Sequence, residues 1–141
     1  MDSHVSKMPL ETAQLLCTAL HLCSDHKDIP YKLTHQNHPC AIWARETLPN
    51  YKTLCNLGLH LCKEYTYRYK KIHASQDVII YCVKHFPNIP DTIQTPFALA
   101  MGDEYKLEDP IESYRNYYIE AKQHLARWKN RNIPSWFTFK K

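Results

Sequence analysis

Proline and glycine usage constrains this chain more than any other feature of its sequence. The 141 residues include nine prolines and only two glycines. Helices therefore have to be ended mainly by proline and by polar capping residues, because the left-handed glycine that closes many helices is scarce. Between the prolines, apolar residues recur every three or four positions, which is typical of amphipathic helices.

This pattern predicts an all-α fold, with one compact domain over residues 1–141 and about five helices. The helices are expected at residues 2 or 8 to 23, from 37–39 up to Pro49, 50–71, 76–85 and 110–128. If the first helix begins at Asp2, Pro9 lies inside it and should kink it. Gly58 is unfavourable in the middle of a helix and predicts close packing against another element.

The segments outside these helices also have distinct characters. Residues 24–37 are polar and predict a loop, whereas residues 87–107 hold three prolines without a clear period and predict a long ordered loop around the body. Long loops in small domains are often functional. Residues 129–141 form a tail rich in basic and aromatic side chains.

Composition excludes several classes of protein. The hydrophobic fraction of 44%, with ten tyrosines among the aromatic residues, is too high for a disordered chain. No apolar run reaches the length of a bilayer span, and the N-terminus lacks the pattern of a secretory signal, so we expect an intracellular, soluble protein. Five of the six cysteines fall in apolar helical stretches and predict buried free thiols, namely Cys17, Cys23, Cys55, Cys62 and Cys82.

The first candidate site is the N-terminal helix. His4, Lys7, Glu11 and Gln14 are spaced by three or four residues, so a continuous helix aligns them on one face. An amine beside a carboxylate suits imine chemistry or general acid-base catalysis, because the amine attacks and the acid shuttles protons. The alternative is an ordinary Lys–Glu pair on a solvated helix face.

The second candidate site comes just before the second helix. His35 and His38, with Arg45 beyond them, could bind a phosphate at the start of that helix or a metal ion. A metal would need further ligands, for which His4, Glu11, Glu64 and His73 are available, but the spacing matches no known zinc or iron site.

Two basic and aromatic segments are candidate nucleic-acid contacts, since cations neutralise phosphates while aromatic rings stack on bases. Arg68 and Lys71 lie at the end of the long helix beside Tyr65. The C-terminal candidates are Arg127, Trp128, Arg131, Trp136 and Phe137. In the alternative interpretation the aromatic residues of both segments pack against the body and the cations are ordinary surface.

Six motifs together resemble a family of small phage and viral proteins. They are D-x-H-V-x-K-M-x-x-E-x-x-Q from residue 2, N-H-P-C-x-x-W-x-R from 37, E-Y-T-Y-R-Y from 64, T-P-F-x-x-A-M-x-D-E-Y from 95, Y-R-x-Y-Y from 114 and R-W-x-x-R-x-x-P-x-W-F from 127. The resemblance covers almost the whole chain and implies the cytoplasm or nucleus of a viral host.

More remotely, the same pattern is similar to the pyrimidine-dimer DNA glycosylases of the endonuclease V type, which are small helical proteins. Their D-x-H and glutamate fall on Asp2, His4 and Glu11. The resemblance implies that Glu11 assists imine formation and β-elimination and that the tail grips DNA. Their nucleophile is an α-amine upstream of the D-x-H motif; here the Met1 amine or Lys7 would take that role.

Three functions are consistent with these residues. The first is a DNA glycosylase and abasic-site lyase that acts on damaged duplex DNA through an imine and needs no cofactor. The second is a non-catalytic nucleic-acid-binding or host-interaction protein on the same scaffold. The third is a metal-dependent nuclease or hydrolase that uses the histidines together with Glu11 or Glu64.

Overall fold

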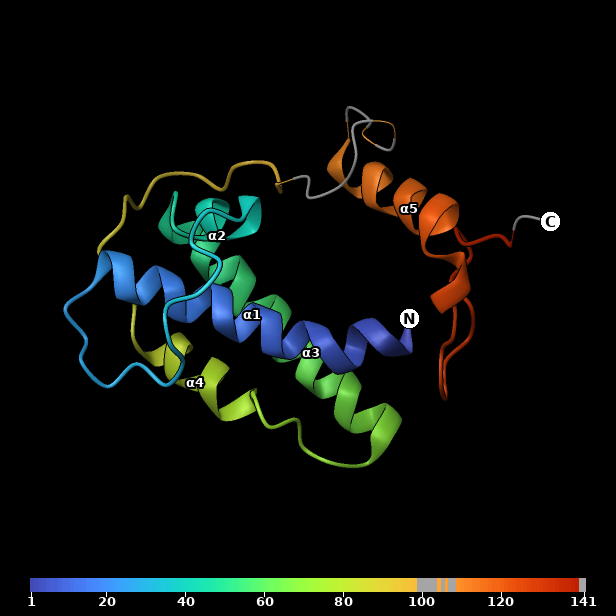
Figure 1. The fold of residues 1–141 in the computed structure, drawn as a ribbon, viewed down its shortest axis with the longest axis horizontal. Coiled ribbons are helices and arrows are strands. Elements are labelled where there is room, and N and C mark those ends of the chain that lie inside the picture. Colours follow the sequence, from blue (N-terminus) through green and yellow to red (C-terminus); the bar gives the residue numbers. More distant parts are fainter. Residues whose placement is uncertain (99–103, 105, 107–108, 140–141) are drawn as a thin grey trace.

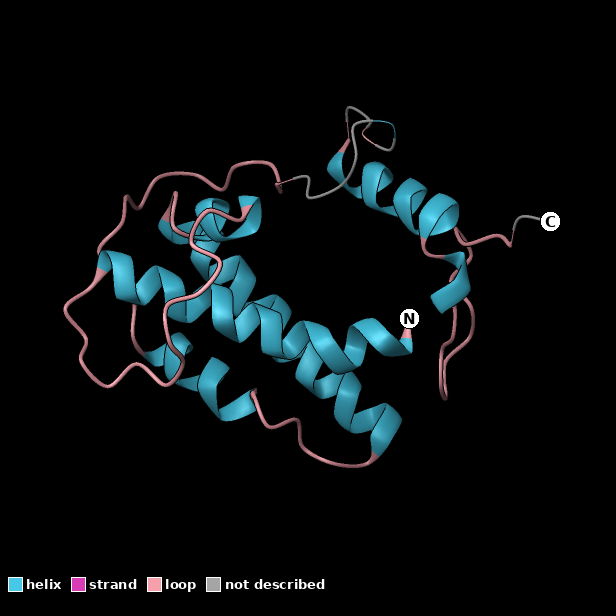
Figure 2. Ribbon diagram, in the orientation of Figure 1, coloured by secondary structure: helices cyan, strands magenta, loops and turns pink. Residues whose placement is uncertain are grey.

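A computed structural model describes residues 1–98, 104, 106 and 109–139 of the chain. The described part contains five α-helices, one short 3-10 turn and no strand, which confirms the all-α prediction (Figures 1 and 2). The elements are α1 (Asp2–Cys23), α2 (Pro39–Ala44), α3 (Leu48–Tyr69), α4 (Gln76–Lys84), α5 (Pro110–Ala121) and η2 (Gln123–Leu125).

Helix α1 begins at Asp2, so Pro9 lies inside it and is buried. Proline has no backbone N–H and its ring crowds the preceding turn, which bends a helix. Figure 1 shows the first turns of α1 veering away from the line of the remaining helix. The kink expected for the longer helix is therefore present.

The predicted helix 50–71 begins and ends two residues earlier, at Leu48 and Tyr69. The Thr47 side chain caps its start by accepting a 3.2 Å hydrogen bond from the Asn50 N–H, and Pro49 fits in the first turn, where no N–H is required. Lys70 closes the helix in the left-handed conformation, at φ 57°. Pro49 was expected to mark the break between two helices. The break lies before it, between the end of α2 at Ala44 and the start of α3 at Leu48.

The core lies where α1, α3 and α4 meet, with α2 packed on one side (Figure 1). Leu16, Leu20, Tyr51 and Ile79 are completely buried there. All six cysteines are free, and four of them are buried: Cys17, Cys55, Cys62 and Cys82. Cys23, which was also expected in the core, is only half-buried because it ends α1 at the surface.

The chain crosses from the core to α5 through the predicted long loop, which the structure describes as irregular for residues 87–98. Its remainder, residues 99–107, falls mostly outside the described residues. Asn50 holds this loop by donating to Thr95 Oγ1 and accepting from the Thr95 N–H, both at 2.9 Å.

Helix α5 ends at Ala121 and not at Trp128, as the sequence pattern had suggested. The residues after it form η2 and then an irregular segment that folds back beside the N-terminus of α1 (Figure 1). None of the helices that the structure describes is long and apolar enough to cross a lipid bilayer.

We predict that Gly58→Val will lower the free energy of unfolding by about 1–3 kcal/mol, the usual cost of overpacking a core. A Cβ atom at this position would lie 2.9 Å from Thr12 Cγ2 and 3.1 Å from Ile79 Cδ1, so α1 and α4 would have to move. Urea unfolding measures the change. Asn56→Val, at an exposed position of the same helix, is the matched control, and equal losses for the two variants would contradict the close packing.

Candidate functional site

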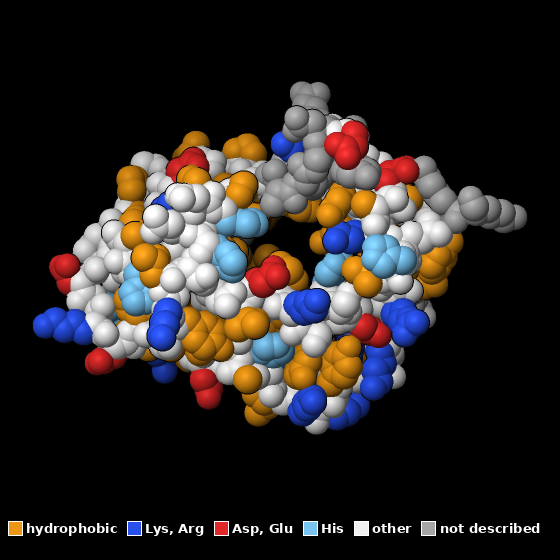
Figure 3. Space-filling view, viewed as in Figure 1, with side chains coloured by type: hydrophobic (Ala, Val, Ile, Leu, Met, Phe, Trp, Pro, Cys, Tyr) orange, Lys and Arg blue, Asp and Glu red, His pale blue; other side chains and the backbone are white. Residues whose placement is uncertain are grey.

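A pocket of about 390 Å³ opens beside α1 on the face shown in Figure 3. The space-filling view shows a hollow in the middle of this face, with imidazole, acidic and basic side chains around its edge. The pocket is lined by Lys7, Leu10, Glu11, Gln14, Leu15, His35 and His38. The structure thus brings part of the first candidate site and the histidines of the second together.

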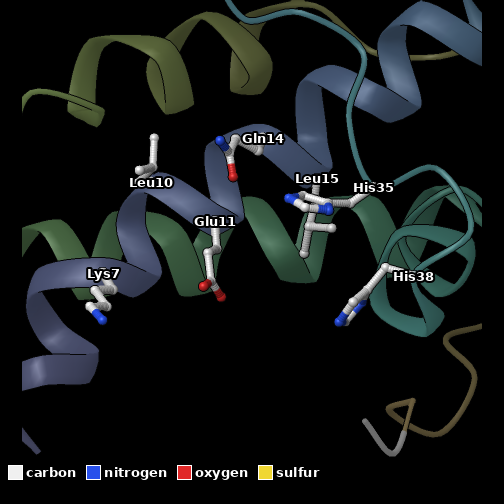
Figure 4. Close-up of a pocket in the computed structure, with 7 residues that line it drawn as sticks. All are labelled: Lys7, Leu10, Glu11, Gln14, Leu15, His35 and His38. Carbon is white, nitrogen blue, oxygen red and sulfur yellow. The ribbon is translucent and has the colours of Figure 1, made fainter.

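Three chemically active groups of this pocket extend into its open space. Figure 4 shows the Lys7 amine, the Glu11 carboxylate and the His38 imidazole extending toward the same open space, with Glu11 between the other two. Lys7 and Glu11 are one turn apart on α1, and all three residues are exposed. The arrangement offers a nucleophile, a carboxylate and an imidazole to a ligand that enters from solvent.

The loop before α2 fixes the orientation of His38. The His38 N–H donates to the His35 carbonyl at 2.9 Å, and His35 turns the chain with a positive φ of 51°. His38 is also the N-cap of α2, because its Nδ1 accepts a 3.1 Å hydrogen bond from the Cys40 N–H. A neutral ring with Nδ1 as acceptor carries its proton on Nε2, so His38 presents a donor.

His4 does not join this pocket, although it shares the helical spacing of Lys7 and Glu11. Its ring stacks on Tyr118 of α5 at a centroid distance of 5.0 Å. Burial, together with the positive charges of the N-terminal amine, Lys122 and Lys7, lowers the pKa of His4 to about 4. His4 is therefore neutral at pH 7 and joins α1 to α5.

The Met1 amine lies at the N-terminal end of α1 and does not line the pocket. Ten residues separate it from Glu11, which corresponds to about 15 Å of helix. Partial burial and the nearby Arg68 guanidinium lower the pKa of this amine. Of the two amines expected to act with Glu11, the structure places only Lys7 in the same pocket.

Four charged residues join the end of α3 to both terminal segments, and we call them the terminal ion-pair cluster: Asp2, Glu64, Arg68 and Arg131. Arg68 Nη1 lies 2.9 Å from Asp2 Oδ1, and Arg68 Nε lies 2.8 Å from Glu64 Oε1. Arg131 binds both Glu64 oxygens at 2.9 Å. Hydrogen bonds to these two arginines lower the pKa of Glu64.

This cluster changes the interpretation of two cations. Arg68 is only 6% exposed and holds two carboxylates, so it is a structural cation, unlike the exposed phosphate ligand that the sequence suggested. Arg131 is 47% exposed but is paired with Glu64, and its guanidinium lies 3.9 Å from the centre of the Tyr67 ring. Lys71 and Arg127 do lie exposed, as a phosphate contact requires.

The aromatic residues of the tail pack mainly on one another. Phe137 is buried, and its ring lies 5.0 Å from Trp128 and 5.8 Å from Trp136. Trp136 also lies 6.4 Å from Tyr118 of α5. The packing interpretation therefore fits Phe137, while the half-buried Trp128 and Trp136 keep part of their surface open.

Arg45 lies apart from the pocket, directly after α2, where its Nη1 is buried without a hydrogen-bond partner. Of the histidines proposed as metal ligands, His35 and His38 share the pocket with Glu11, but His4 and His73 do not join them. His4 stacks on Tyr118, whereas His73 Nε2 lies 2.8 Å from the Ser6 carbonyl oxygen. Over the described residues, no three His, Cys, Asp or Glu side chains are grouped so that they could hold a metal ion.

Sequence reasoning missed a second cavity, which lies between the core and α5. It has a volume of about 340 Å³, and its walls include Trp43, Tyr114, Tyr118 and Trp136. The four-residue spacing of Tyr114 and Tyr118 could have indicated a shared helix face. That Tyr114 and Tyr118 line the same cavity as Trp43 and Trp136 depends on contacts between segments far apart in the sequence.

We predict that Glu64→Gln will loosen the tail, because it removes the carboxylate that binds Arg131. Trypsin should then cleave after Arg127, Lys129 and Arg131 several-fold faster than in the unchanged protein, which mass spectrometry of timed digests measures. Glu112→Gln, which removes an exposed carboxylate paired only with Arg115 in the described contacts, is the control. Unchanged cleavage in Glu64→Gln would show that the other contacts of the tail hold it without the Glu64 carboxylate.

We predict that His4 makes the fold less stable as the pH falls from about 7 to about 5. The unfolded chain takes up a proton near the ordinary histidine pKa of 6.5, whereas folded His4 does so only near 4. The contribution of His4 to the free energy of unfolding is therefore fully present above its pKa in the unfolded chain. It is lost as the pH falls toward its pKa in the folded protein. The urea midpoints at pH 7 and pH 5 should differ less for His4→Phe than for the unchanged protein. The phenylalanine keeps a ring against Tyr118 but cannot take up a proton.

His60→Phe, on the exposed surface of α3, is the control for this pH measurement. It should keep the full difference between the two urea midpoints. If His4→Phe also keeps it, His4 is not the group responsible.

Comparison of the chain with known protein families, with curated proteins and with solved structures finds no match. The functional interpretation of the pocket therefore depends on its own residues and geometry.

Proposed function

We propose that the chain acts on damaged DNA as a glycosylase and abasic-site lyase, with Lys7 as the nucleophile and Glu11 as its acid-base partner. One observation carries the proposal: Lys7 and Glu11 lie one helical turn apart and line the same open pocket. His38 extends into that space from the opposite side (Figure 4). Pyrimidine dimers are the lesion that the sequence resemblance implies.

The chemistry follows from these groups. Deprotonated Lys7 Nζ attacks C1′ of an opened abasic sugar, and the resulting carbinolamine loses water to form an imine. Glu11 accepts the proton that Lys7 releases, and the His38 Nε2–H can donate to the departing oxygen. Removal of a C2′ proton then breaks the bond between C3′ and its oxygen, so the 3′ phosphate leaves. Hydrolysis of the imine returns the amine.

At a damaged nucleotide that still carries its base, the same amine would displace the base at C1′. The bond from C1′ to the base breaks, and the departing base takes up a proton. The C1′–O4′ bond of the sugar ring then opens, with O4′ taking up a proton as the Lys7 nitrogen loses one, so that the sugar is attached to Lys7 through the same imine. The elimination then proceeds as at an abasic site.

Exposed cations supply a surface for the DNA backbone. Lys70 and Lys71 follow α3, and Arg127 and Lys129 lie in the neighbouring tail. Figure 3 shows Lys and Arg side chains gathered over this end of the molecule, on the side of the hollow where α1 begins. Lys129 lies 5.2 Å over the Tyr69 ring, which holds one of these cations in place.

We predict that borohydride will trap a covalent complex between the protein and abasic-site DNA. Lys7→Arg keeps the positive charge but cannot form an imine, so it should abolish the cross-link while leaving DNA binding intact. Glu11→Gln should slow trapping by about 100-fold or more, the usual contribution of a general acid-base group. Gel electrophoresis of the trapped complex, with ultraviolet-irradiated DNA in parallel, measures both effects.

Lys63→Arg is the matched control, since Lys63 is an exposed lysine of α3 outside this pocket. It should cross-link as well as the unchanged protein. A cross-link that survives Lys7→Arg would refute Lys7 as the nucleophile, and acetylation of the N-terminal amine would then show whether Met1 supplies it.

A second candidate function is binding of nucleic acid without catalysis. The exposure of both Lys7 and Glu11 favours it, because such a pair is also common on a solvated helix face. Salt-sensitive DNA binding with no trapped complex on either DNA would select this function over the lyase.

A further inference from the structure

The second cavity is open to solvent on one side and is lined by parts of the chain that are far apart in sequence. Trp43 comes from α2, Phe97 from the long loop, Tyr114 and Tyr118 from α5, and Trp136 from the tail. Figure 1 shows α5 standing across from α1 and α2. The aromatic side chains named above line the cavity from both sides. We call this space, with a volume of about 340 Å³, the aromatic cavity.

Two of the rings that line the aromatic cavity are held in place by hydrogen bonds at their edges. The Trp43 indole N–H donates to the Thr95 carbonyl at 3.2 Å, and the Tyr114 hydroxyl donates to the Ala98 carbonyl. Trp43 and Phe97 lie 5.0 Å apart with their planes inclined by 33°. The cavity is therefore bounded by oriented aromatic faces and does not depend on a ligand to position them.

Two polar groups accompany these rings. Thr12 lines the cavity and is completely buried, and its hydroxyl oxygen has no hydrogen-bond partner. Such buried unsatisfied groups are uncommon in folded proteins. Arg115 lies on the α5 side, with its guanidinium 5.4 Å from the centre of the Trp136 ring.

We propose that the aromatic cavity is a binding site for a planar aromatic small molecule of one or two fused rings. Aromatic rings pair favourably with centroids about 4.5–7 Å apart, which favours a planar ligand against these walls. A dry cavity of about 150 Å³ already holds benzene, so the larger aromatic cavity has room for a second ring.

This site differs from the Lys7–Glu11 pocket in both position and chemistry. The two share Leu15, but none of the charged or imidazole groups of the pocket lines the aromatic cavity. The proposal therefore requires neither imine chemistry nor DNA, and it can fail while the lyase proposal stands.

Isothermal titration calorimetry with indole, in the absence of nucleic acid, tests the proposal. We expect one indole per chain with a dissociation constant below about 1 mM. Ile111→Trp should weaken binding at least tenfold, because Ile111 lines the cavity and its larger replacement fills the space. Ile111 is 53% exposed, so this change does not disturb the core.

Ile93→Trp is the matched control, since Ile93 is 74% exposed and does not line the cavity. It should bind indole as the unchanged protein does. The proposal is overturned if the unchanged protein binds no indole at millimolar concentration, or if Ile111→Trp binds it equally well. Tighter binding of n-hexanol than of indole would also overturn it, because the cavity would then prefer a flexible aliphatic chain to a planar aromatic ring.

Discussion

The buried guanidinium of Arg68 joins the helical core to both terminal segments of the chain. A buried cation is costly unless carboxylates surround it, and Asp2 and Glu64 meet that requirement from two different helices. Each carboxylate has a further partner in the tail: Asp2 accepts from the Lys129 N–H at 2.8 Å, and Glu64 binds Arg131. The position of the tail, and with it one wall of the aromatic cavity, depends on this one buried charge.

Helix α1 serves both the core and the candidate active site. One side of it, with Leu16, Cys17 and Leu20, is completely buried in the core, while Lys7 and Glu11 extend from the other side into solvent. Because α1 packs on α3 at Gly58 without space for even one more carbon atom, the helix that carries Lys7 and Glu11 is rigidly seated. The proposed catalytic pair is thus exposed to substrate but carried by a helix that is closely packed on its other side, which favours a fixed reaction geometry.

The two proposed sites depend on different parts of the molecule. The Lys7–Glu11 pocket needs α1 and the loop before α2, which are tied together by Thr18, whose hydroxyl donates to the Thr34 carbonyl at 2.7 Å. The aromatic cavity needs α5 and the tail, which contact the core through the His4–Tyr118 stack and the terminal ion-pair cluster. A change that releases the tail should therefore open the aromatic cavity while leaving Lys7 and Glu11 in place.

The sequence by itself determined the helical class, the loop before α2, the positions of most helix starts and the close approach at Gly58. These follow from proline, capping residues and apolar spacing, which act over a few neighbouring residues. It also determined that Lys7, Glu11 and Gln14 share one face. It did not separate His4 from them, because that depends on the stack of His4 on Tyr118, a contact between residues far apart in the chain. Only the tertiary structure decided that Arg68 is buried, that Arg131 is paired and that five aromatic residues line a cavity, because burial and pairing depend on contacts between residues far apart in the chain.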